Sequence, residues 1–517
     1  MTQRRAGVAL VGRVGRNGLF NLMRLGISVP VFLLLTPYMV RGLGEVGYGV
    51  WALVMATLAV TALGDLGISA ALTRFVAVEE AENRKRLHEL VNTAAGLYLG
   101  VALLGGLLLM LIHSWLLRSF FQVPPELLAP ARTLLVGSLL AVLVNFVATA
   151  WYAVLPGLQR YAASNVVGIA ATLAFAVTVV GVLEAGWGLA GLALAPWVQT
   201  GVSAGGHAWV LRKVTPELGV NPMAFRAGTA KELVAFSTRV FVGQFSEFAD
   251  QQMDKLILGR YVGSVEVGLY HVAATVGRHL RAIPVHLMAP LLPAASELTG
   301  QGEDRRVQGA FQDGVRYSWA VGGIICSGTL LLAIPFMELW LGGSYAPARV
   351  AQGALLLQIL GVALFLNVLS APYTFVMTGV GEPGVLARSA SIHLVLNVGL
   401  SLWWVRDWGL LGVASATLVA TVVGLAYLLV RCNVRLGLGP LAYPRLVWRP
   451  ALAAGVMGGV GALLGWHEPD GLASVMGLIG GAGVVTGGYL TLLGVLRFPR
   501  PEELAALRRW SRSWTRS

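Results

Sequence analysis

Charged side chains are scarce in this 517-residue chain, at 12% of residues, against about 25% in soluble globular domains. The chain is 56% hydrophobic, and its mean hydropathy is +0.72. These values exclude an ordinary soluble protein and predict an integral membrane protein. Only two cysteines are present, Cys326 and Cys432, so the sequence contains no disulfide framework and no C-x-x-C metal motif.

Lysine is nearly absent, with four residues among the 38 basic ones, yet the net charge is +13. The basic residues lie mainly in short loops between apolar stretches, with no long basic run, so we predict no binding of nucleic acid. A G-x-x-x-x-G-K-[ST] phosphate loop is missing, which excludes ATP binding of that kind. The sequence predicts no cofactor and no metal site.

Apolar runs long enough to cross a bilayer, roughly 20 residues each, recur along the whole chain. Fourteen are present: 18–40, 47–75, 90–112, 131–155, 164–183, 187–210, 233–258, 267–295, 314–336, 351–377, 387–405, 409–430, 450–467 and 473–496. The expected fold is an all-α integral membrane protein with about 14 transmembrane helices. If both termini are placed in the cytosol, most of the basic residues outside the spans lie on the cytosolic side, as is usual in membrane proteins. Only six basic residues then lie outside: Arg41, Arg118, Arg132, Arg260, Arg349 and Arg406.

Short motifs recur at a constant offset of 221 residues. Trp187–Ala193 (WGLAGLA) returns as Trp408–Ala414 (WGLLGVA), and Glu45-Val-Gly47 returns as Glu266-Val-Gly268. The pattern predicts a duplicated unit of six spans. Because six is even, both copies enter the membrane in the same direction, which gives two parallel six-helix lobes.

The predicted organisation has six parts. They are a basic cytosolic N-terminal segment (1–17), a first lobe (18–210), a cytosolic linker (211–232), a second lobe (233–430), two extra helices (450–496) and a basic cytosolic tail (497–517). The two extra helices are rich in glycine, which favours close helix packing, with an apolar groove as the alternative.

Ionisable residues inside apolar spans are energetically costly and usually face a cavity or a partner. Arg24 lies in the first span, and Arg278 and Arg281 lie near the middle of the eighth. Guanidinium groups stay charged when desolvated and bind phosphates through paired hydrogen bonds. We interpret these arginines as the substrate-binding lining of a cationic cavity between the lobes, suited to a diphosphate head group. The alternative is that the eighth-span arginines pair with acids of the seventh span.

The seventh span carries a second set of charges. Glu247, Asp250 and Asp254 share one helix face at i, i+3 and i+7, and Arg239 falls on the same stripe. His271 of the eighth span shares a face with the arginines there. We interpret these five residues as a coupling or intramembrane charge network, with simple pairing of Arg239 to an acid of its own helix as the alternative.

Asp65 lies near the cytosolic end of an overlong second span, in the segment Gly64–Phe75 (GDLGISAALTRF). With its two flanking glycines, Asp65 is expected to break the helix and cap the half-helix that follows. A gate or an ion site is the alternative role.

Several segments resemble Wzx-type polysaccharide flippases. The matching segments are 37–51, 65–69 and 156–160 in the first half and 254–263, 267–270 and 378–383 in the second. The likeness covers about residues 15–430. It places the chain in the superfamily shared by MATE exporters and the peptidoglycan lipid flippase MurJ.

The resemblance implies a V-shaped, two-lobed transporter of the bacterial cytoplasmic (inner) membrane. It would move an undecaprenyl-diphosphate-linked oligosaccharide, an O-antigen or exopolysaccharide unit, by alternating access. Its partners would be that lipid-linked anionic oligosaccharide and membrane lipids, with polysaccharide polymerase or assembly proteins as further candidates. In the MurJ branch, cavity arginines lie on the first and eighth helices, which here carry Arg24, Arg278 and Arg281. A MATE-type multidrug or cation antiporter is the alternative, and it would favour cavity acids.

Other classes fit less well. Asp250 and Asp254 match one D-x-x-x-D motif of membrane prenyltransferases, which hold Mg²⁺-diphosphate between two such motifs, but a second motif is missing. The longest external loop, about 113–130, is short for a polysaccharide polymerase or ligase. The loop after the second span lacks the D-R-x-G-R-R-like signature of major-facilitator proteins. We therefore predict a transporter and not an enzyme.

Overall fold

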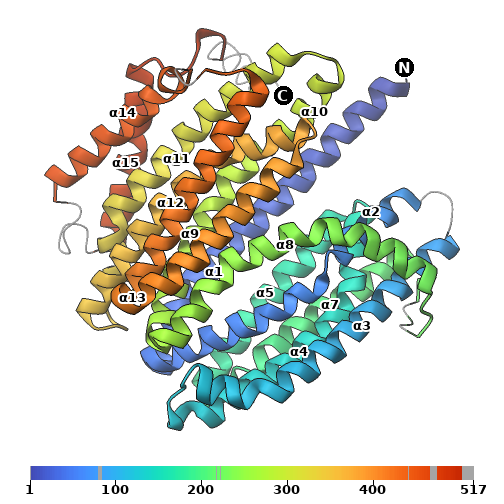
Figure 1. The fold of residues 1–517 in the computed structure, drawn as a ribbon. Helices are drawn as coiled ribbons and strands as arrows, with labels where there is room; N and C mark the ends of the chain where they lie inside the picture. Colours follow the sequence, from blue (N-terminus) through green and yellow to red (C-terminus); the bar gives the residue numbers. More distant parts are fainter. Residues whose placement is uncertain are drawn as a thin grey trace. The chain divides into compact units, whose positions relative to one another are not determined.

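A computed structural model describes residues 2–79, 84–216, 218–219, 221, 223–439, 442–465 and 474–503. These residues form helices joined by short turns, and no strand occurs among them (Figure 1). Nine of the described helices are long and apolar enough to cross a membrane. The all-α membrane class is therefore confirmed, while the number of fourteen transmembrane helices stays a prediction. The chain divides into two compact units, Met1–His271 and Val272–Ser517.

The first unit is a bundle of long helices joined by short turns. Its elements are α1 (Thr2–Ala59), the 3₁₀ helix η1 (Val60–Asp65), α2 (Ile68–Glu79), α3 (Arg84–Trp115), the π-helix η2 (Leu116–Phe120), α4 (Pro125–Gly157), α5 (Tyr161–Glu184), α6 (Gly188–Gly191), α7 (Leu194–Val214), α8 (Ala227–Tyr261) and the first turns of α9 (Ser264–Met288).

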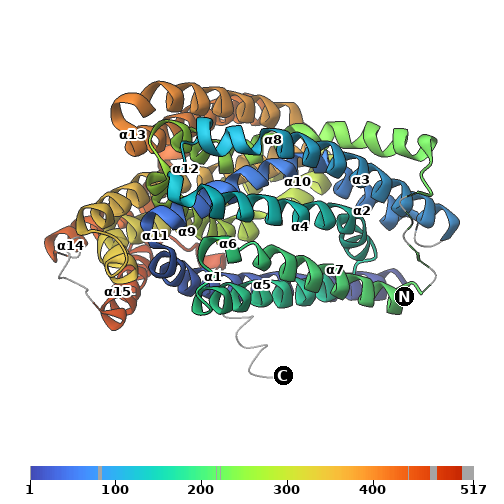
Figure 2. The same ribbon diagram turned by 90° about the horizontal axis from the view of Figure 1, so that it is seen from below.

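The ends of α2, α4 and α7 and the beginnings of α3, α5 and α8 lie together at one end of this unit (Figure 2). We call it the basic end, because residues 74–79, 84–86, 157–161, 212–216 and 223–231 there include nine Lys and Arg residues. A concentration of basic residues at one end is typical of the cytosolic side of a membrane protein.

The core of the first unit joins α8 to the preceding helices. Leu72 of α2, Leu90 of α3, Val154 of α4 and Leu233 of α8 are fully buried and belong to one hydrophobic cluster. Burying such a side chain contributes about 1.5–3 kcal/mol. α8 contains the first span of the predicted second lobe. In the structure, part of α8 packs against α1, α2 and α3.

The two copies of the Glu-Val-Gly motif approach each other in the first unit. A Cβ atom added to Gly49 would lie 1.9 Å from the carbonyl oxygen of Ser264, and one added to Gly268 would lie 3.1 Å from the Cα of Gly49. Only glycine permits backbones to come this close. The duplicated segments therefore meet backbone to backbone.

The second unit contains the rest of α9 and six further helices. They are α10 (Leu291–Gly300), α11 (Asp304–Leu341), α12 (Pro347–Gly379), α13 (Pro383–Leu436), α14 (Ala442–Leu463) and α15 (Val475–Val495). One core cluster joins α10–α13, with fully buried Phe311, Val376 and Cys432. A second cluster joins α11, α14 and α15 around Tyr489.

Two long helices each contain a sharp break at a glycine. Gly44 in α1 has φ 73° and ψ 167°, and Gly409 in α13 has φ 52° and ψ −126°. Both conformations are readily available only to glycine. The break in α1 falls between the first and second predicted spans, and the break in α13 falls at the start of the twelfth. α13 therefore contains two predicted spans, whereas α1 contains the first span and part of the second.

The segment after α15 is attached to α11 and α14. Glu503 forms an ion pair with Arg316, Arg500 lies 3.0 Å from Asp313, and Arg449 donates a hydrogen bond to the carbonyl of Arg497 at 2.7 Å. Burial by itself would raise the pKa of Glu503, but hydrogen bonds from Arg500 N and Tyr317 and the charge of Arg316 lower it overall. The remainder of the predicted tail, 504–517, lies outside the described residues.

Candidate functional site

Arg24 lies in α1 with an exposed side chain that reaches α5. Its Cζ is 3.3 Å from the place that a Cβ on Gly168 would take, so the missing side chain makes room for the guanidinium. His207 of α7 lies within electrostatic range of Arg24. Because the carbonyl of Ser203 can only accept, Nδ1 of His207 donates to it at 2.8 Å, and Nε2 accepts from the Ser164 hydroxyl at 3.2 Å.

A chain of polar groups continues from His207 into α4. The rings of Tyr152 and His207 have centroids 4.5 Å apart, and the Tyr152 hydroxyl donates to Oδ1 of Asn145 at 3.0 Å. His207 and Tyr152 were not predicted as site residues. A nearby sequence signal was the recurrence of Asn145 as Asn367, at an offset of 222 residues.

The second predicted span is interrupted directly after Asp65. The 3₁₀ helix η1 ends at Asp65, Leu66 and Gly67 have positive φ, and α2 begins at Ile68. The carboxylate accepts bonds from Ser69 N at 3.1 Å, from the Ser69 hydroxyl at 2.8 Å and from the Tyr98 hydroxyl. It also borders a cavity of about 330 Å³ with Gln251 and Gln252 of α8.

We expect Asp65→Ala to lower thermal stability, because it removes a cap and leaves the buried Tyr98 hydroxyl without this acceptor, a loss of about 1–3 kcal/mol. Asp65→Asn keeps the acceptor oxygen and should unfold close to the wild type. The two thermal midpoints are compared in detergent, and transport is measured in parallel. Normal transport by Asp65→Asn would contradict a gate or ion site that needs the negative charge.

The predicted charge network of the seventh span is partly visible in α8. Asp254 and Lys255 are each 2% exposed. Asp254 accepts a hydrogen bond from the Tyr270 hydroxyl of α9, and Lys255 Nζ donates to Gln252 Oε1 at 2.8 Å. Asp254 thus joins α8 to α9, which is a structural role in addition to any coupling role.

The remaining residues of the predicted network are Asp250, His271, Arg239 and Glu247. Asp250 is half-buried, and His271 packs edge-on against Trp51 with ring centroids 5.5 Å apart. The side chains of Arg239 and Glu247 lie outside the described part of α8. The structure therefore brings Asp254 and His271 into separate contacts, and a shared coupling function stays a prediction.

In the second unit, α9 presents two different faces. Arg278 is exposed, with Nη2 3.5 Å from the Thr275 hydroxyl, and Arg281 is half-buried. Val276 and Leu280 instead line an apolar groove of about 420 Å³ formed with α11, α12 and α15. At 100° per residue, the two arginines point away from the groove-lining face.

The glycine-rich helices α14 and α15 both pack closely, and α15 also lines the apolar groove. A Cβ on Gly461 would clash with Leu331, and one on Gly488 would approach Met457, so these glycines permit close packing. Gly455, Gly458 and Gly480 have open space around them. The groove is lined on the α15 side by residues 478–486.

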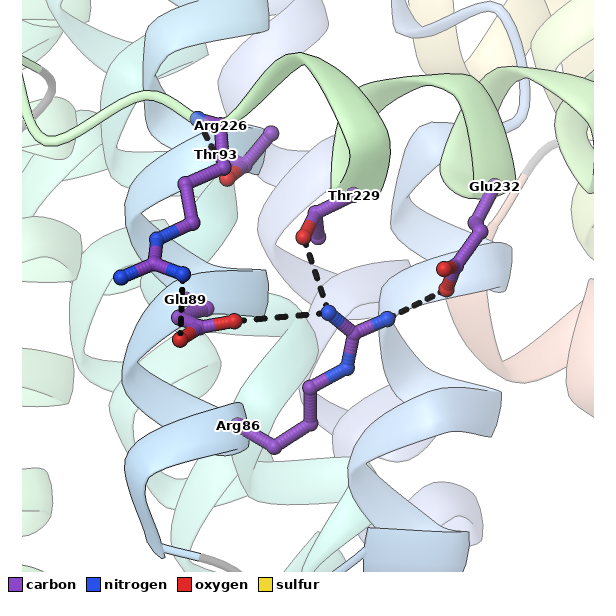
Figure 3. Close-up of polar contacts among 6 residues, drawn as sticks. All are labelled: Arg86, Glu89, Thr93, Arg226, Thr229 and Glu232. Carbon is purple, nitrogen blue, oxygen red and sulfur yellow. Dashed lines mark hydrogen bonds and ion pairs between the residues drawn. The ribbon is translucent and has the colours of Figure 1, made fainter.

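An ion-pair network fixes the start of α8 to α3 at the basic end (Figure 3). Arg86 contacts Glu89 at 3.4 Å, the Thr229 hydroxyl at 2.9 Å and the carboxylate of Glu232. Arg226 contacts Glu89 at 3.1 Å. Linked charges of this kind restrain geometry more than an isolated surface pair does. Pairing between residues so far apart in the chain, Arg86 with Glu232 and Arg226 with Glu89, was not predictable from the sequence.

A family model described as "Polysaccharide biosynthesis protein" matches residues 14–298, more than half of the chain. The chain belongs to this family. As a family member it is similar to a putative O-antigen transporter of Shigella flexneri, with 21% identity over 79% of this chain and 95% of the relative. The resemblance to Wzx-type proteins seen in the sequence is confirmed.

Solved structures show the same fold. The lipid II flippase MurJ in an inward closed conformation is similar with a TM-score of 0.70 and 13% identity, over 91% of this chain and 98% of MurJ. An inward-facing multidrug resistance MATE family transporter of the MOP superfamily has a TM-score of 0.68 and 16% identity, over 80% and 98% of the two chains. This family member therefore has the fold common to both groups, and the fold alone does not separate them.

Proposed function

We propose that this protein is a flippase that moves an undecaprenyl-diphosphate-linked oligosaccharide, an O-antigen or exopolysaccharide unit, across the bacterial cytoplasmic membrane by alternating access. The observation that carries the proposal is the family match together with the arginines that lie inside the spans predicted from the sequence, Arg24 in α1 and Arg278 and Arg281 in α9. Exposed guanidinium groups in the middle of apolar helices avoid lipid and face water or a ligand. A diphosphate is the head group that they suit best.

The apolar groove beside α9 supports a lipid-linked substrate. Its lining contains Ile324, Leu332, Phe336 and Ile479, with few polar atoms. A polyprenyl chain has matching chemistry, since burying each CH₂ group contributes about 0.8 kcal/mol. Arg278 and Arg281 lie on the same helix as two groove residues, so one helix contributes to both the charged and the apolar contacts.

The membrane arrangement is part of the proposal. We place the basic end and both termini in the cytosol, with lobes 18–210 and 233–430 joined by the linker 211–232, two extra helices at 450–496 and a tail at 497–517. The basic residues of α3, α7 and α8 at one end support this orientation. Polysaccharide polymerase or assembly proteins are the proposed protein partners.

The function is tested by complementation of a strain that lacks its own O-antigen flippase. We expect expression of this chain to restore surface glycan and to remove the lipid-linked oligosaccharide that accumulates at the inner face of the membrane. Both are measured, by gel profile of the glycan and by mass spectrometry of the lipid extract. Unchanged accumulation across several glycan types, with the protein present in the membrane, would contradict the proposal.

A MATE-type cation antiporter is the alternative, and the shared fold and the buried Asp254 are what favour it. The resistance of the same strain to a panel of cationic drugs is therefore measured as well. Raised drug resistance without glycan rescue would identify an antiporter.

A further inference from the structure

A pocket of about 540 Å³ lies at the basic end of the first unit, between α2, α4 and the start of α5. Its polar lining includes Thr73, Arg74, Thr149, Tyr152, Gln159 and Tyr161. The lining contains no carboxylate. The volume falls within the range of small-molecule sites, about 300–1,000 Å³. Both its size and its charge therefore suit a small anionic ligand.

Arg74 is held by aromatic rings and not by an acid. Its Cζ lies 4.9 Å from the ring centroid of Phe236 in α8 and 5.6 Å from that of Phe75. Among the described residues, no carboxylate forms an ion pair with it, in contrast to Arg86 and Arg226 close by. A cation–π contact fixes the guanidinium plane but leaves its charge and its N–H edge available. That edge suits a phosphate.

The hydroxyl groups of the pocket are oriented as acceptors. Thr73 donates its hydrogen to the carbonyl of Ala153 at 3.0 Å, Thr149 donates to the carbonyl of Asn145 at 3.0 Å, and Tyr152 donates to the side chain of Asn145. The Thr73 and Thr149 oxygens therefore keep lone pairs for donors on a ligand, and the Tyr152 oxygen, which also accepts from Ser203, keeps one. Sugar hydroxyls are donors of this kind.

The pocket also unites two sequence motifs that resemble those of flippases. Ser69 comes from the segment 65–69, and Pro156 and Gln159 come from the turn 156–160; Arg74 follows the first of these segments by five residues. Gln159 adopts φ 56°, a conformation that costs a residue other than glycine about 1–3 kcal/mol. Unfavourable backbone conformations of this sort persist where the surroundings hold them and often mark functional sites.

We propose that this pocket binds a phosphorylated sugar, with the phosphate on Arg74 and the sugar hydroxyls on Thr73, Thr149 and Tyr152. The proposal rests on the proposed function for the source of the ligand, which would be the sugar next to the diphosphate of the lipid-linked glycan. Tyr152 also contacts His207 beside Arg24. The pocket is then a docking subsite at the basic end, connected through Tyr152 to the polar groups around Arg24.

The test measures binding of glucose 1-phosphate to the purified full-length protein through its thermal unfolding midpoint in detergent. We expect glucose 1-phosphate to raise the midpoint of the wild type more than glucose or inorganic phosphate does. Arg74→Ala should need at least about tenfold more ligand for the same shift, since a charge-assisted bond is lost, and Arg74→Lys should be intermediate. Arg212→Ala removes an exposed arginine from the same end and should respond like the wild type.

Three results would overturn the proposal. They are an equal shift in Arg74→Ala and the wild type, an equal shift by inorganic phosphate and glucose 1-phosphate, and loss of the wild-type response in nanodiscs of phosphatidylglycerol but not of phosphatidylcholine. The last result would assign the pocket to a lipid head group. Complementation by the wild type is scored separately, so a failure of the flippase function and a failure of this subsite are distinguishable.

Discussion

Arg278→Ala or Arg281→Ala is expected to abolish transport of the lipid-linked oligosaccharide while the protein reaches the membrane in normal amount. Each change removes a charge-assisted contact to phosphate, at a cost of about 1.5–3 kcal/mol, which corresponds to a loss of roughly 10–100-fold. Arg278 is exposed in α9, so its removal leaves no cavity in a packed core. The measurements are accumulated lipid-linked oligosaccharide and the amount of protein by immunoblot.

The matched control is Arg388→Ala. Arg388 is an exposed arginine near the start of α13, where its Nε donates to the carbonyl of Gly384 at 3.2 Å. We expect this variant to transport normally, and Arg278→Lys to keep part of the activity because lysine retains the charge but not the bidentate geometry. Normal transport by both Arg278→Ala and Arg281→Ala would exclude the cavity assignment.

Gly49→Ala is expected to lower the stability of the folded protein strongly. The new Cβ would lie 1.9 Å from the carbonyl oxygen of Ser264 and 2.4 Å from its carbonyl carbon, so two backbones must separate. Inserting one carbon into a tight interior costs about 1–3 kcal/mol when side chains adjust, and backbone atoms adjust less. We expect a loss of about 3 kcal/mol and a much lower yield of folded protein.

Gly105→Ala provides the control for that change. Gly105 lies within α3, and a Cβ there meets no atom within 4 Å. Alanine has the higher helix propensity, by about 1 kcal/mol, so this variant should equal or exceed the wild type in thermal midpoint. Unfolding of Gly49→Ala at the same temperature as Gly105→Ala would contradict the close approach of the backbone at Gly49 to that at Ser264.

The candidate site was only partly predictable. Arg24, Arg278 and Arg281 stand out in the sequence because each is a charge in an apolar run, where a charge is costly. His207 and Tyr152 are ordinary members of their helices, and they become notable only through their contact across α4 and α7. Arg74 is one of many basic residues near a helix end, and its contact with the ring of Phe236 in α8 is visible only in space.

The duplicated segments likewise were recognisable in the sequence, whereas their contact was not. The 221-residue offset marked Glu45–Gly47 and Glu266–Gly268 as related segments. It did not indicate that Gly49 and Gly268 would be in contact, or that α8 would pack on α2 and α3 in the first unit. Periodicity describes a single helix, whereas a contact depends on where two helices cross.

By itself, the sequence determined that this is an all-α membrane protein, which family it resembles, and which apolar spans contain arginines. These properties follow from local composition, because transfer into lipid depends on the residues of each span alone. Only the tertiary structure decided which polar groups meet, from the contact of Arg86 with Glu232 to the grouping of Arg74 with Thr73, Thr149 and Tyr152. Those groupings depend on the rotation and crossing of helices, which are set by packing among side chains far apart in the chain.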